Sequence, residues 1–300
     1  MDSIIERADL DNSKLLPYTF FMKYFIFGNG YIGNHFQKFI GENAVISKAD
    51  ISDYNTVKAE LAKETPDVVI NCAGKTGKPN VDWCEDHKLE TITSNVTGPL
   101  TLLRACGEVG IYWVHIGSGC VYTGDNEGKG FSEDDTPNFF GSFYSRTKMW
   151  SEAILKEFPV LQLRLRMPID TTSNSRNLIK KITTYKKIIS IPNSVSVLED
   201  FLRAGMTLIE KRATGIYNMT NPSAIEHREI LDMYREIVDP SFTYEIFSLD
   251  EMNQLTKAGR SNCVLSSEKR EAEGAHMRPI KEALRDTLEK YKENLTDRNN

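Results

Sequence analysis

The chemically suggestive residues that stand out first are Tyr144 and Lys148, which lie four positions apart in a segment with a helical pattern. Side chains at this spacing share one face of a helix. The lysine charge can lower the pKa of the phenol, which prepares the tyrosine to donate a proton to a carbonyl group that is being reduced. The same spacing is common on exposed helices, so its meaning depends on the motifs that accompany it.

A glycine-rich turn precedes this pair in the chain. Its sequence, Gly28-Asn-Gly30-Tyr-Ile-Gly33, lies between an apolar run and a helical pattern. Glycines at these places permit a tight turn and a close approach of the backbone to a pyrophosphate, and the amino terminus of the helix then faces the phosphates. We therefore predict a dinucleotide site at this turn, with Tyr144 and Lys148 as further cofactor-binding residues, of which Lys148 can reach the nicotinamide ribose. The residues assigned to the turn are Gly28, Gly30, Tyr31, Ile32 and Gly33.

The ends of the following strands bear on the choice of cofactor. The strand expected at Ala44–Ser47 has no acidic residue at its end to bind both ribose hydroxyls, and Ser47 and Lys48 occupy that place. A hydroxyl and an ammonium group can hold a 2′-phosphate, which favours NADPH, with NADH as the alternative. The competing interpretation of Lys48 is a solvated loop lysine. We also assign to the cofactor three residues that close the next strand, Asn71, Ala73 and Gly74.

These residues lie in a repeated alternation of strand and helix patterns. Strands at Tyr24–Phe27 and Val68–Asn71 alternate with helices at 57–63 and 95–108, and further strands follow at 112–117 and 161–166. Repeated units of this kind predict a parallel sheet with helices on both faces. The expected fold class is α/β, a Rossmann-like doubly wound parallel sheet with a smaller C-terminal substrate-binding lobe.

The same patterns suggest a division of the chain into domains. We expect an NADP-binding Rossmann domain at 23–167 and a substrate-binding lobe at 168–300, with segments near 190–225 returning to the first domain. Residues 1–22 are interpreted as an N-terminal extension, because Met22 stands directly before the first strand pattern.

Ser118 closes the strand at 112–117, and Cys120 follows two positions later. Residues i and i+2 of an extended segment point the same way, so both side chains can face one pocket. The serine hydroxyl can share with Tyr144 in stabilising charge on a ketone oxygen. A thiolate at Cys120 can remove a proton from a carbon beside that ketone, although most cysteines are small buried apolar residues.

The order of the motifs resembles the extended short-chain dehydrogenase/reductase superfamily, in which a serine or threonine after the fifth strand completes the catalytic set with the tyrosine and lysine. Ser118 matches that position. Asn95 matches a helix asparagine of the same fold, for which we expect a structural role. The resemblance therefore implies a catalytic role for Ser118, Tyr144 and Lys148.

Longer segments resemble the plant and viral nucleotide-rhamnose synthases, which are bifunctional 3,5-epimerase/4-reductases. These segments are Pro79-Asn-Val-Asp-Trp-Cys-Glu85, 137–148, Arg164-Leu-Arg-Met-Pro-Ile169, Ile191-Pro-Asn-Ser194 and Tyr217-Asn-Met-Thr-Asn-Pro222. The resemblance implies UDP-4-keto-6-deoxyglucose as the substrate, proton exchange at C3 and C5, and then reduction at C4. The glycine turn departs from the usual GxxGxxG spacing of that family.

Further site residues follow from this resemblance. Cys120 matches the base for epimerisation, a role that it also has in the similar GDP-fucose synthases. Lys181 aligns best with the partner acid, although Lys180 is adjacent. A solvated helix lysine is the competing interpretation for both. The residues expected to contact the substrate are Thr76, Val81, Asp82, Asn138, Asn193 and Arg260.

Composition narrows the alternatives. The chain has 300 residues, a formal net charge of −5 and no clustered basic stripe, which argues against nucleic acid or a membrane as the main partner. Five cysteines and five histidines show no metal-ligand spacing, so we expect no metal and a reducing, cytoplasmic location. We expect an upstream 4,6-dehydratase as the source of substrate, and a homodimer is possible.

Three alternatives to the bifunctional enzyme stay open on the sequence. The first is a plain 4-keto reductase of the dTDP-rhamnose type, and the second is an epimerase/reductase of the GDP-fucose type. The third is a non-catalytic, reductase-like regulatory subunit. Cys120 argues against the plain reductase, and the set of Ser118, Tyr144 and Lys148 argues against the regulatory subunit.

Overall fold

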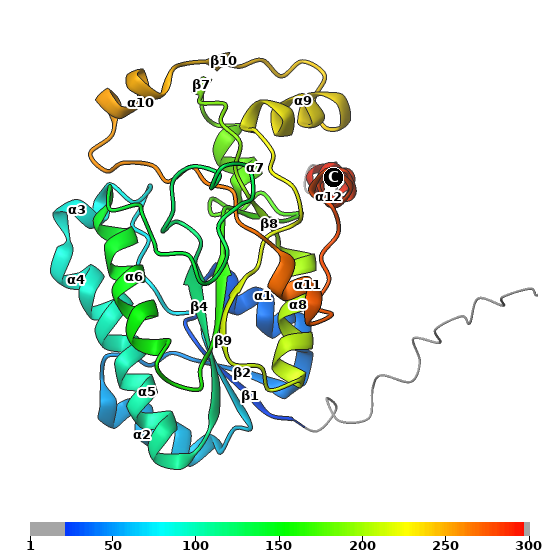
Figure 1. Ribbon diagram of the computed structural model, residues 1–300. Helices are drawn as coiled ribbons and strands as arrows, with labels where there is room; N and C mark the ends of the chain where they lie inside the picture. The colour runs from blue at the N-terminus through cyan, green and yellow to red at the C-terminus, as the bar shows by residue number, and fades with distance from the viewer. Residues whose placement is uncertain (1–21, 297–300) are drawn as a thin grey trace, which may run out of the picture.

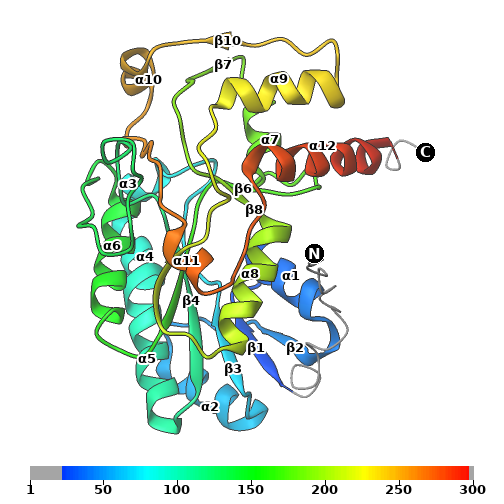
Figure 2. The ribbon, with the colours of Figure 1, turned by 45° about the vertical axis from the view of Figure 1, so that its right-hand side comes forward.

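The computed structural model describes residues 22–296 of the chain (Figure 1). The expected N-terminal extension, apart from Met22, lies outside the described residues. The described part consists of a sheet domain and a smaller lobe that lies along one edge of the sheet (Figures 1 and 2).

A parallel sheet of six strands forms the centre of the larger part, in the order β2-β1-β3-β4-β5-β9. The order reverses between β1 and β3, which is where open α/β sheets place their ligands. The α/β doubly wound fold predicted from the sequence is confirmed. The strands are β1 (Tyr24–Phe27), β2 (Ala44–Ser47), β3 (Val68–Asn71), β4 (Tyr112–Ser118), β5 (Leu161–Leu165) and β9 (Gly215–Asn218).

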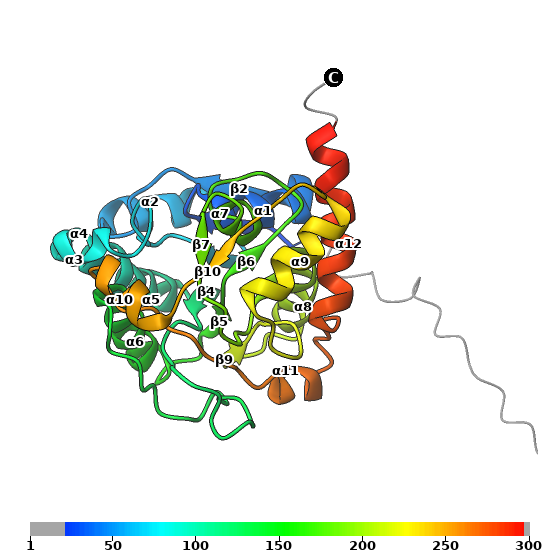
Figure 3. The same cartoon turned by 90° about the horizontal axis from the view of Figure 1, so that it is seen from above.

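Helices cover both faces of the sheet, as the view from above shows (Figure 3). Along β1, Tyr24 and Ile26 pack into one apolar cluster, whereas Phe25 and Phe27 pack into another. Side chains of a strand alternate between its faces, so a strand that is apolar throughout must be buried on both sides. One face carries α1 (Tyr31–Ile40) and α8 (Leu198–Glu210), and the other carries α2 (Tyr54–Glu64), α5 (Gly98–Val109) and α6 (Phe143–Leu155).

The smaller lobe has an apolar core of its own. Ile179, Ile230 and Leu284 are fully buried within one cluster that joins three of its helices. Such a contiguous cluster lets the lobe hold its shape beside the sheet. Its elements are α7 (Leu178–Ile182), α9 (His227–Ile237), α10 (Leu249–Leu255), α12 (Ile280–Thr296) and the strand pairs β6 (Pro168–Ile169) with β8 (Ser196–Val197) and β7 (Lys187–Ile188) with β10 (Glu245–Ile246).

The chain returns to the sheet after it enters the lobe. β9 pairs in parallel with β5, and α8 packs beside α1 on one face. Both elements lie within 190–225, the range expected to rejoin the first domain. The boundary at residue 167 itself stays a prediction.

No helix in the part of the chain that the structure describes is long and apolar enough to cross a bilayer.

Candidate active site

The start of α6 fixes the directions of Tyr144 and Lys148. The Ser142 side chain accepts a hydrogen bond from the Ser145 N–H, so the helix begins at Phe143. A serine in this capping position satisfies a backbone donor that the helix itself cannot bond. Tyr144 and Lys148 then follow one turn apart, facing the carboxyl end of β4.

Lys148 lies in a buried polar chain. Its Nζ donates to the Ile116 carbonyl over 3.0 Å and lies 3.2 Å from Nε2 of His115. Burial lowers the pKa of Lys148 to about 8, while the charge of Glu152 acts in the opposite direction. Burial also lowers the pKa of His115 well below its ordinary value, and the charge of Lys148 adds to that effect. His115 is therefore neutral at physiological pH.

The electrostatic environment of Tyr144 differs from the expectation. Burial raises the pKa of its phenol, a nearby Cys120 thiolate would raise it further, and a hydrogen bond with Ser118 lowers it. The expected lowering by Lys148 is wrong for this structure, because desolvation of the phenolate dominates. Tyr144 is thus held as a protonated phenol, the form needed to donate a proton.

Ser118 and Cys120 lie together at the end of β4. The Ser118 hydroxyl accepts a hydrogen bond from the Cys120 N–H over 3.1 Å. The Cys120 Sγ accepts a hydrogen bond from Arg166 Nη1 over 3.3 Å. A guanidinium at this distance stabilises a thiolate, the form of cysteine that removes protons.

Lys181 faces the same site from α7. Burial lowers its pKa, the charge of Arg176 lowers it further, and Cys120 raises it. The interaction with Cys120 places Lys181 within electrostatic reach of the thiol. The adjacent Lys180 lies in the same helix. This interaction supports Lys181 as the partner acid, and the choice between the two lysines stays a prediction.

The glycine turn forms a cradle at the amino terminus of α1. A side chain at Gly28, whose φ is +101°, would come within 2.4 Å of the Ala73 nitrogen, and one at Gly33 within 2.1 Å of the Gly28 carbonyl oxygen. Gly30, in contrast, faces open space. An open glycine at a helix amino terminus fits a pyrophosphate. A cavity of about 490 Å³ lies here, lined by Asn29, Gly30, Tyr31, Asn34, His35, Thr172, Ser173 and Asn174.

Ser47, at the end of β2, already forms hydrogen bonds within the protein, which the sequence did not predict. The Ser47 hydroxyl donates to the Glu60 carboxylate from α2 and accepts from the Ala49 N–H. It is therefore engaged within the protein, and the 2′-phosphate contact expected of this region would fall to the exposed Lys48.

The end of β3 lies beside the glycine turn. The Asn71 Oδ1 accepts from the Ala73 N–H over 3.0 Å, which fixes the turn that carries Ala73 and Gly74. Asn95, in the π-helical turn η4 (Thr93–Thr97), donates to the Lys75 carbonyl and to the Thr147 hydroxyl. These bonds fit the structural role expected of Asn95, since they tie the β3 turn to α6.

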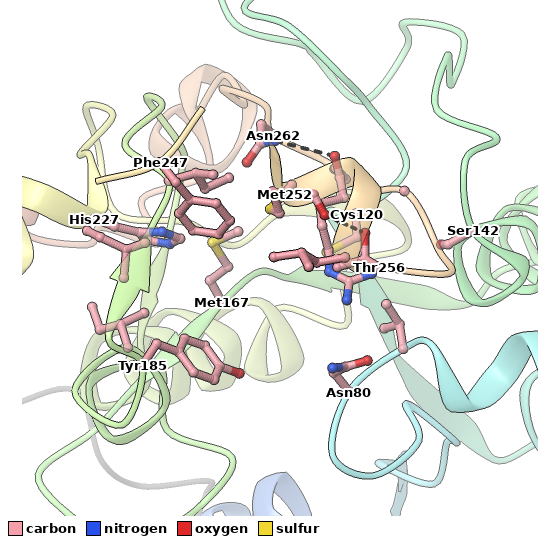
Figure 4. A pocket seen from close by; sticks show the side chains of 18 of the residues that line it. Asn80, Cys120, Ser142, Met167, Tyr185, His227, Phe247, Met252, Thr256 and Asn262 are labelled. Atoms are coloured by element: carbon pink, nitrogen blue, oxygen red, sulfur yellow. Dashed lines mark hydrogen bonds between the residues drawn. The ribbon is translucent and has the colours of Figure 1, made fainter. Parts of the chain in front are cut away.

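A larger cavity of about 760 Å³ opens between the sheet edge and the lobe (Figure 4). Cys120 and Tyr144 line it from the sheet side. Figure 4 shows Tyr185, His227 and Phe247 of the lobe gathered on the side opposite Cys120. The catalytic candidates therefore face a space large enough for a nucleotide-sized ligand.

Two of the expected substrate contacts line this cavity, Val81 and Arg260. Asp82 forms a two-point ion pair with Arg260, with bonds of 2.8 and 3.1 Å. Arg260 lowers the pKa of Asp82 against the effect of burial. The carboxylate thus holds the Arg260 guanidinium at the cavity wall.

The other three are engaged with protein groups. Thr76 accepts from Arg176 over 2.6 Å, and Asn138 is bonded to the backbone of Thr123 on the surface. Asn193 is 1% exposed, and its amide bonds Arg166, Ile191, Asn262 and Cys263. Asn193 is accordingly placed as a support for Arg166, and substrate contact by these residues stays a prediction.

A model of the RmlD substrate binding domain family matches residues 22–293. The chain belongs to this family. Among curated relatives, the bifunctional dTDP-4-dehydrorhamnose 3,5-epimerase/dTDP-4-dehydrorhamnose reductase of Arabidopsis thaliana is 41% identical over 288 residues, covering 92% of this chain and 94% of that protein. A trifunctional UDP-glucose 4,6-dehydratase/UDP-4-keto-6-deoxy-D-glucose 3,5-epimerase/UDP-4-keto-L-rhamnose-reductase of the same plant is 40% identical, but the match covers 88% of this chain and 41% of the relative.

Solved structures of similar proteins support the same family assignment. The UDP-rhamnose synthase of Acanthamoeba polyphaga mimivirus matches this RmlD-family chain with a TM-score of 0.85 and 34% identity, covering 90% of this chain and 99% of that one. The dTDP-4-dehydrorhamnose reductase of Bacillus anthracis, solved with NADP, shares the fold with a TM-score of 0.75 and 19% identity, over 89% of this chain and 98% of that one. The predicted family resemblance and the expectation of an enzyme are confirmed.

Three residues of this RmlD-family site received no role from the sequence: His115, Arg166 and Arg176. Arg166 lies in a segment that carries the family resemblance, and Arg176 lies shortly before Lys180 and Lys181. These positions could have indicated that both arginines belong to the site. Arg166 follows Arg164 by two positions at the end of β5, and Arg176 donates to Thr76 and to the Gly77 carbonyl. His115 offered no signal, since a single histidine inside an apolar strand is usually a satisfied core residue.

Proposed function

We propose that this RmlD-family chain is a bifunctional 3,5-epimerase/4-reductase that converts UDP-4-keto-6-deoxy-D-glucose to UDP-L-rhamnose with NADPH. The observation that carries the proposal is that Tyr144 and Cys120, a candidate acid and a candidate base, line one cavity. Tyr144 with Ser118 suits ketone reduction, and Cys120 with Lys181 suits proton exchange. The names of the relatives, which join epimerase and reductase activities, support it.

In the epimerisation stage, Cys120 acts as the base. The thiolate, stabilised by Arg166, takes a proton from the carbon beside the C4 ketone and leaves an enolate. Ser118 and Tyr144 stabilise the enolate oxygen through their hydroxyls. Lys181 then gives a proton to the same carbon from the opposite side, which inverts it, and one such exchange at C3 and one at C5 complete the stage.

In the reduction stage, NADPH when bound supplies the hydride to C4. Tyr144 gives its phenolic proton to the C4 oxygen, because its raised pKa keeps it protonated until charge develops on that oxygen. Ser118 orients the ketone by hydrogen bonding. Lys148, one turn further along α6, would contact the nicotinamide ribose when the cofactor is bound, and its ammonium form would supply the proton that restores the Tyr144 phenol.

The protein groups that would hold the cofactor are those of the cradle and the neighbouring strand ends. We assign the pyrophosphate to Gly28, Gly30 and the amino terminus of α1, and the 2′-phosphate to Lys48. Asn71, Ala73 and Gly74 would complete the cofactor site at the end of β3. Tyr31, Ile32 and Gly33 begin the helix that faces the phosphates.

We assign the substrate diphosphate to Arg260, because its planar group can donate two bonds to a phosphate and Asp82 orients it at the cavity. Val81 and Thr76 would contact the sugar from the segment before α3 (Trp83–Asp86). Asn138 and Asn193 complete the proposed set. A 4,6-dehydratase must supply the 4-keto sugar. We place the protein in the cytoplasm, where its five free thiols persist.

The first test is to mix the purified protein with UDP-4-keto-6-deoxyglucose and NADPH in deuterated buffer. We expect loss of cofactor absorbance and formation of UDP-L-rhamnose that carries deuterium at C3 and C5, measured by NMR. A C4-reduced D-sugar without deuterium would remove the epimerase half. The dTDP-linked substrate is tested beside it, because one relative is named for dTDP-linked chemistry.

A further inference from the structure

A buried chain of polar groups runs behind Lys148 from β3 to α6. The Ala73 N–H donates to Asn71 Oδ1 over 3.0 Å, and Asn71 Nδ2 lies 3.1 Å from His115 Nδ1. On the other side of the imidazole, His115 Nε2 lies 3.2 Å from Lys148 Nζ. Asn71, His115 and Lys148 are 0%, 1% and 6% exposed, respectively, so their polar groups must find hydrogen-bond partners within the protein.

The backbone N–H of Ala73 determines which group donates in each hydrogen bond between these side chains. A peptide N–H only donates, so Asn71 must turn its Oδ1 toward Ala73 and its Nδ2 toward His115. The Nδ2 group also only donates, so Nδ1 of His115 must be a bare acceptor. A neutral imidazole then carries its proton on Nε2, the nitrogen that faces Lys148.

This tautomer treats the two forms of Lys148 differently. A neutral amine has a lone pair that accepts from Nε2–H, and it can still donate to the Ile116 carbonyl. An ammonium group has no lone pair, so it would set one donor against another across 3.2 Å. The alternative tautomer only moves the conflict to Asn71. All of these hydrogen bonds can form when Lys148 is a neutral amine.

We propose that His115 is a positioning residue for the reduction: Asn71 holds its proton on Nε2, and Nε2–H stabilises the amine form of Lys148. Lys148 therefore releases its proton readily, and a group that changes form near neutral pH can take and return a proton during turnover. This catalytic consequence rests on the proposed function. The tautomer and its effect on Lys148 do not.

The other charged groups around Lys148 do not supply the same effect. Glu152, in α6, favours the ammonium form and is itself paired with Arg164 of β5 over 2.7 and 2.8 Å. Glu85 and Lys88 contact the first turn of the helix at Phe143. Titratable groups that face α6 from neighbouring elements include Glu85 of α3, Lys88 of α4 (Lys88–Ile92), His115 of β4 and Arg164 of β5. At Tyr144 they also include Cys84, Cys120 and Arg176. The direction of the pKa shift of Lys148, downward through burial, agrees with the proposal.

Nuclear magnetic resonance tests the proposal without any substrate. The nitrogen shifts of His115, assigned by their loss in His115→Phe, should show a bare Nδ1 and a protonated Nε2 at a pH above 8 in the native protein. A protonated Nδ1 would overturn the proposal. The titration midpoint of Lys148, followed at its Cε and assigned with Lys148→Met, gives the second readout.

Two variants shift that midpoint for different reasons. His115→Phe keeps the ring volume and removes Nε2–H, so the midpoint of Lys148 should rise by about one pH unit. Asn71→Asp presents an acceptor to Nδ1, so the imidazole should move its proton to Nδ1 and offer a bare Nε2 to the ammonium, with a rise at least as large. An unmoved midpoint in both folded variants would overturn the proposal.

Activity then separates this proposal from the proposed function. With saturating NADPH and substrate, the alkaline limb of the reduction rate should move upward with the Lys148 midpoint in both variants. If the native protein reduces no nucleotide sugar, the proposed function fails, yet the tautomer and midpoint measurements still decide the role of His115.

Discussion

The two walls of the large cavity are built differently. The sheet wall carries Cys120 and Tyr144, which come from the end of β4 and the start of α6. Hydrogen bonds fix the neighbouring side chains of Ser118 and Lys148. The lobe wall, formed by Met167, Tyr185, His227, Phe247, Met252 and Leu255, is largely apolar or aromatic. Tyr185 and Leu255 are 47% and 78% exposed.

The contrast separates chemistry from recognition. Proton transfer requires atoms held within a fraction of an ångström, which strand ends and a capped helix provide. A broad apolar wall can accept a bulky ligand with small adjustments of its side chains. We therefore expect substitutions in the sheet wall to change rates by orders of magnitude and substitutions in the lobe wall to change mainly binding.

The largest effect is expected at Cys120. Cys120→Ala should reduce deuterium incorporation at C3 and C5 by up to about 10⁴-fold, because the proton loses its acceptor. NADPH binding, measured by fluorescence titration, should be unchanged. Cys120→Ser serves as the size-matched control and should be similarly impaired, since a serine hydroxyl is a far weaker acid than a thiol. Exchange at the native rate in Cys120→Ala would remove this residue from the mechanism.

Tyr144→Phe should slow single-turnover oxidation of NADPH by about 10²-fold or more, the scale of a lost acid catalyst. The effect should be smaller than at Cys120, because Ser118 still hydrogen-bonds the ketone oxygen. Deuterium exchange should persist at a reduced rate. Full reductase activity in this variant would contradict the assignment of the sheet wall as the reductive site.

The two lysines of α7, Lys180 and Lys181, form a matched pair that tests which lobe residue donates the proton in epimerisation. Lys181→Met should lower epimerisation by about 10²-fold, because no acid then faces Cys120 across the substrate. Lys180→Met should have little effect. Equal losses in the two variants would indicate a general charge effect of α7 rather than proton donation by Lys181.

A change in the lobe wall should act mainly on KM. Phe247→Ala removes an aromatic ring from the cavity and should raise KM for the nucleotide sugar by about 10-fold, with kcat within about twofold, on the scale of a lost apolar contact. Ile246→Ala is the control, because Ile246 precedes Phe247 and does not line the cavity. A loss in kcat rather than KM for Phe247→Ala would contradict the division between the walls.

The smallest effect concerns an ion pair between the sheet part and the loop after β6. His35 Nε2 lies 2.8 Å from the Asp170 carboxylate. Burial opposes protonation of His35, but its bond to Asp170 prevails and raises its pKa, and that bond lowers the pKa of Asp170 against burial. The pair is thus fully formed where histidine is protonated and aspartate ionised.

The sign of the pH dependence follows. The His35 contribution is present below its unfolded pKa of about 6.5 and is lost as pH rises through the raised folded value. The Asp170 contribution is present above about 3.9 and is lost as pH falls through the lowered folded value. His35→Gln should therefore lower the free energy of unfolding by about 1 kcal/mol near pH 5 to 6, and by less at pH 8.

Urea unfolding of the native protein, His35→Gln and the exposed control His276→Gln at both pH values provides the measurement. His276 also contacts a carboxylate, but its side chain is 72% exposed. A loss in His35→Gln that grows toward pH 8 would contradict the assignment.

Much of the fold was predictable because its signals are local. Apolar strands such as Tyr24–Phe27 and Val68–Asn71 lie where the alternating patterns indicated. The pairing of β9 with β5, in contrast, is encoded by no local pattern. The helical segment expected around Tyr144 and Lys148 begins at Phe143, because Ser142 caps it. The strand order, with its reversal between β1 and β3, required the tertiary contacts.

The candidate site divides in the same way. Ser118, Cys120, Tyr144 and Lys148 could be named from sequence, since each lies at a fixed distance from a strand end or within one helical turn. The partners of Asn193 and Ser47 could not be, because Arg166 and Glu60 reach them from other elements.

The sequence by itself determined the residue types available for chemistry and their spacing along strands and helices, because those depend on local periodicity. The tertiary structure decided how those residues are charged and oriented. The pKa of Tyr144 is raised rather than lowered, and His115 presents one particular nitrogen to Lys148. The physical reason is that desolvation and hydrogen-bond direction depend on neighbours from distant parts of the chain, which meet only when the sheet edge and the lobe close around the site.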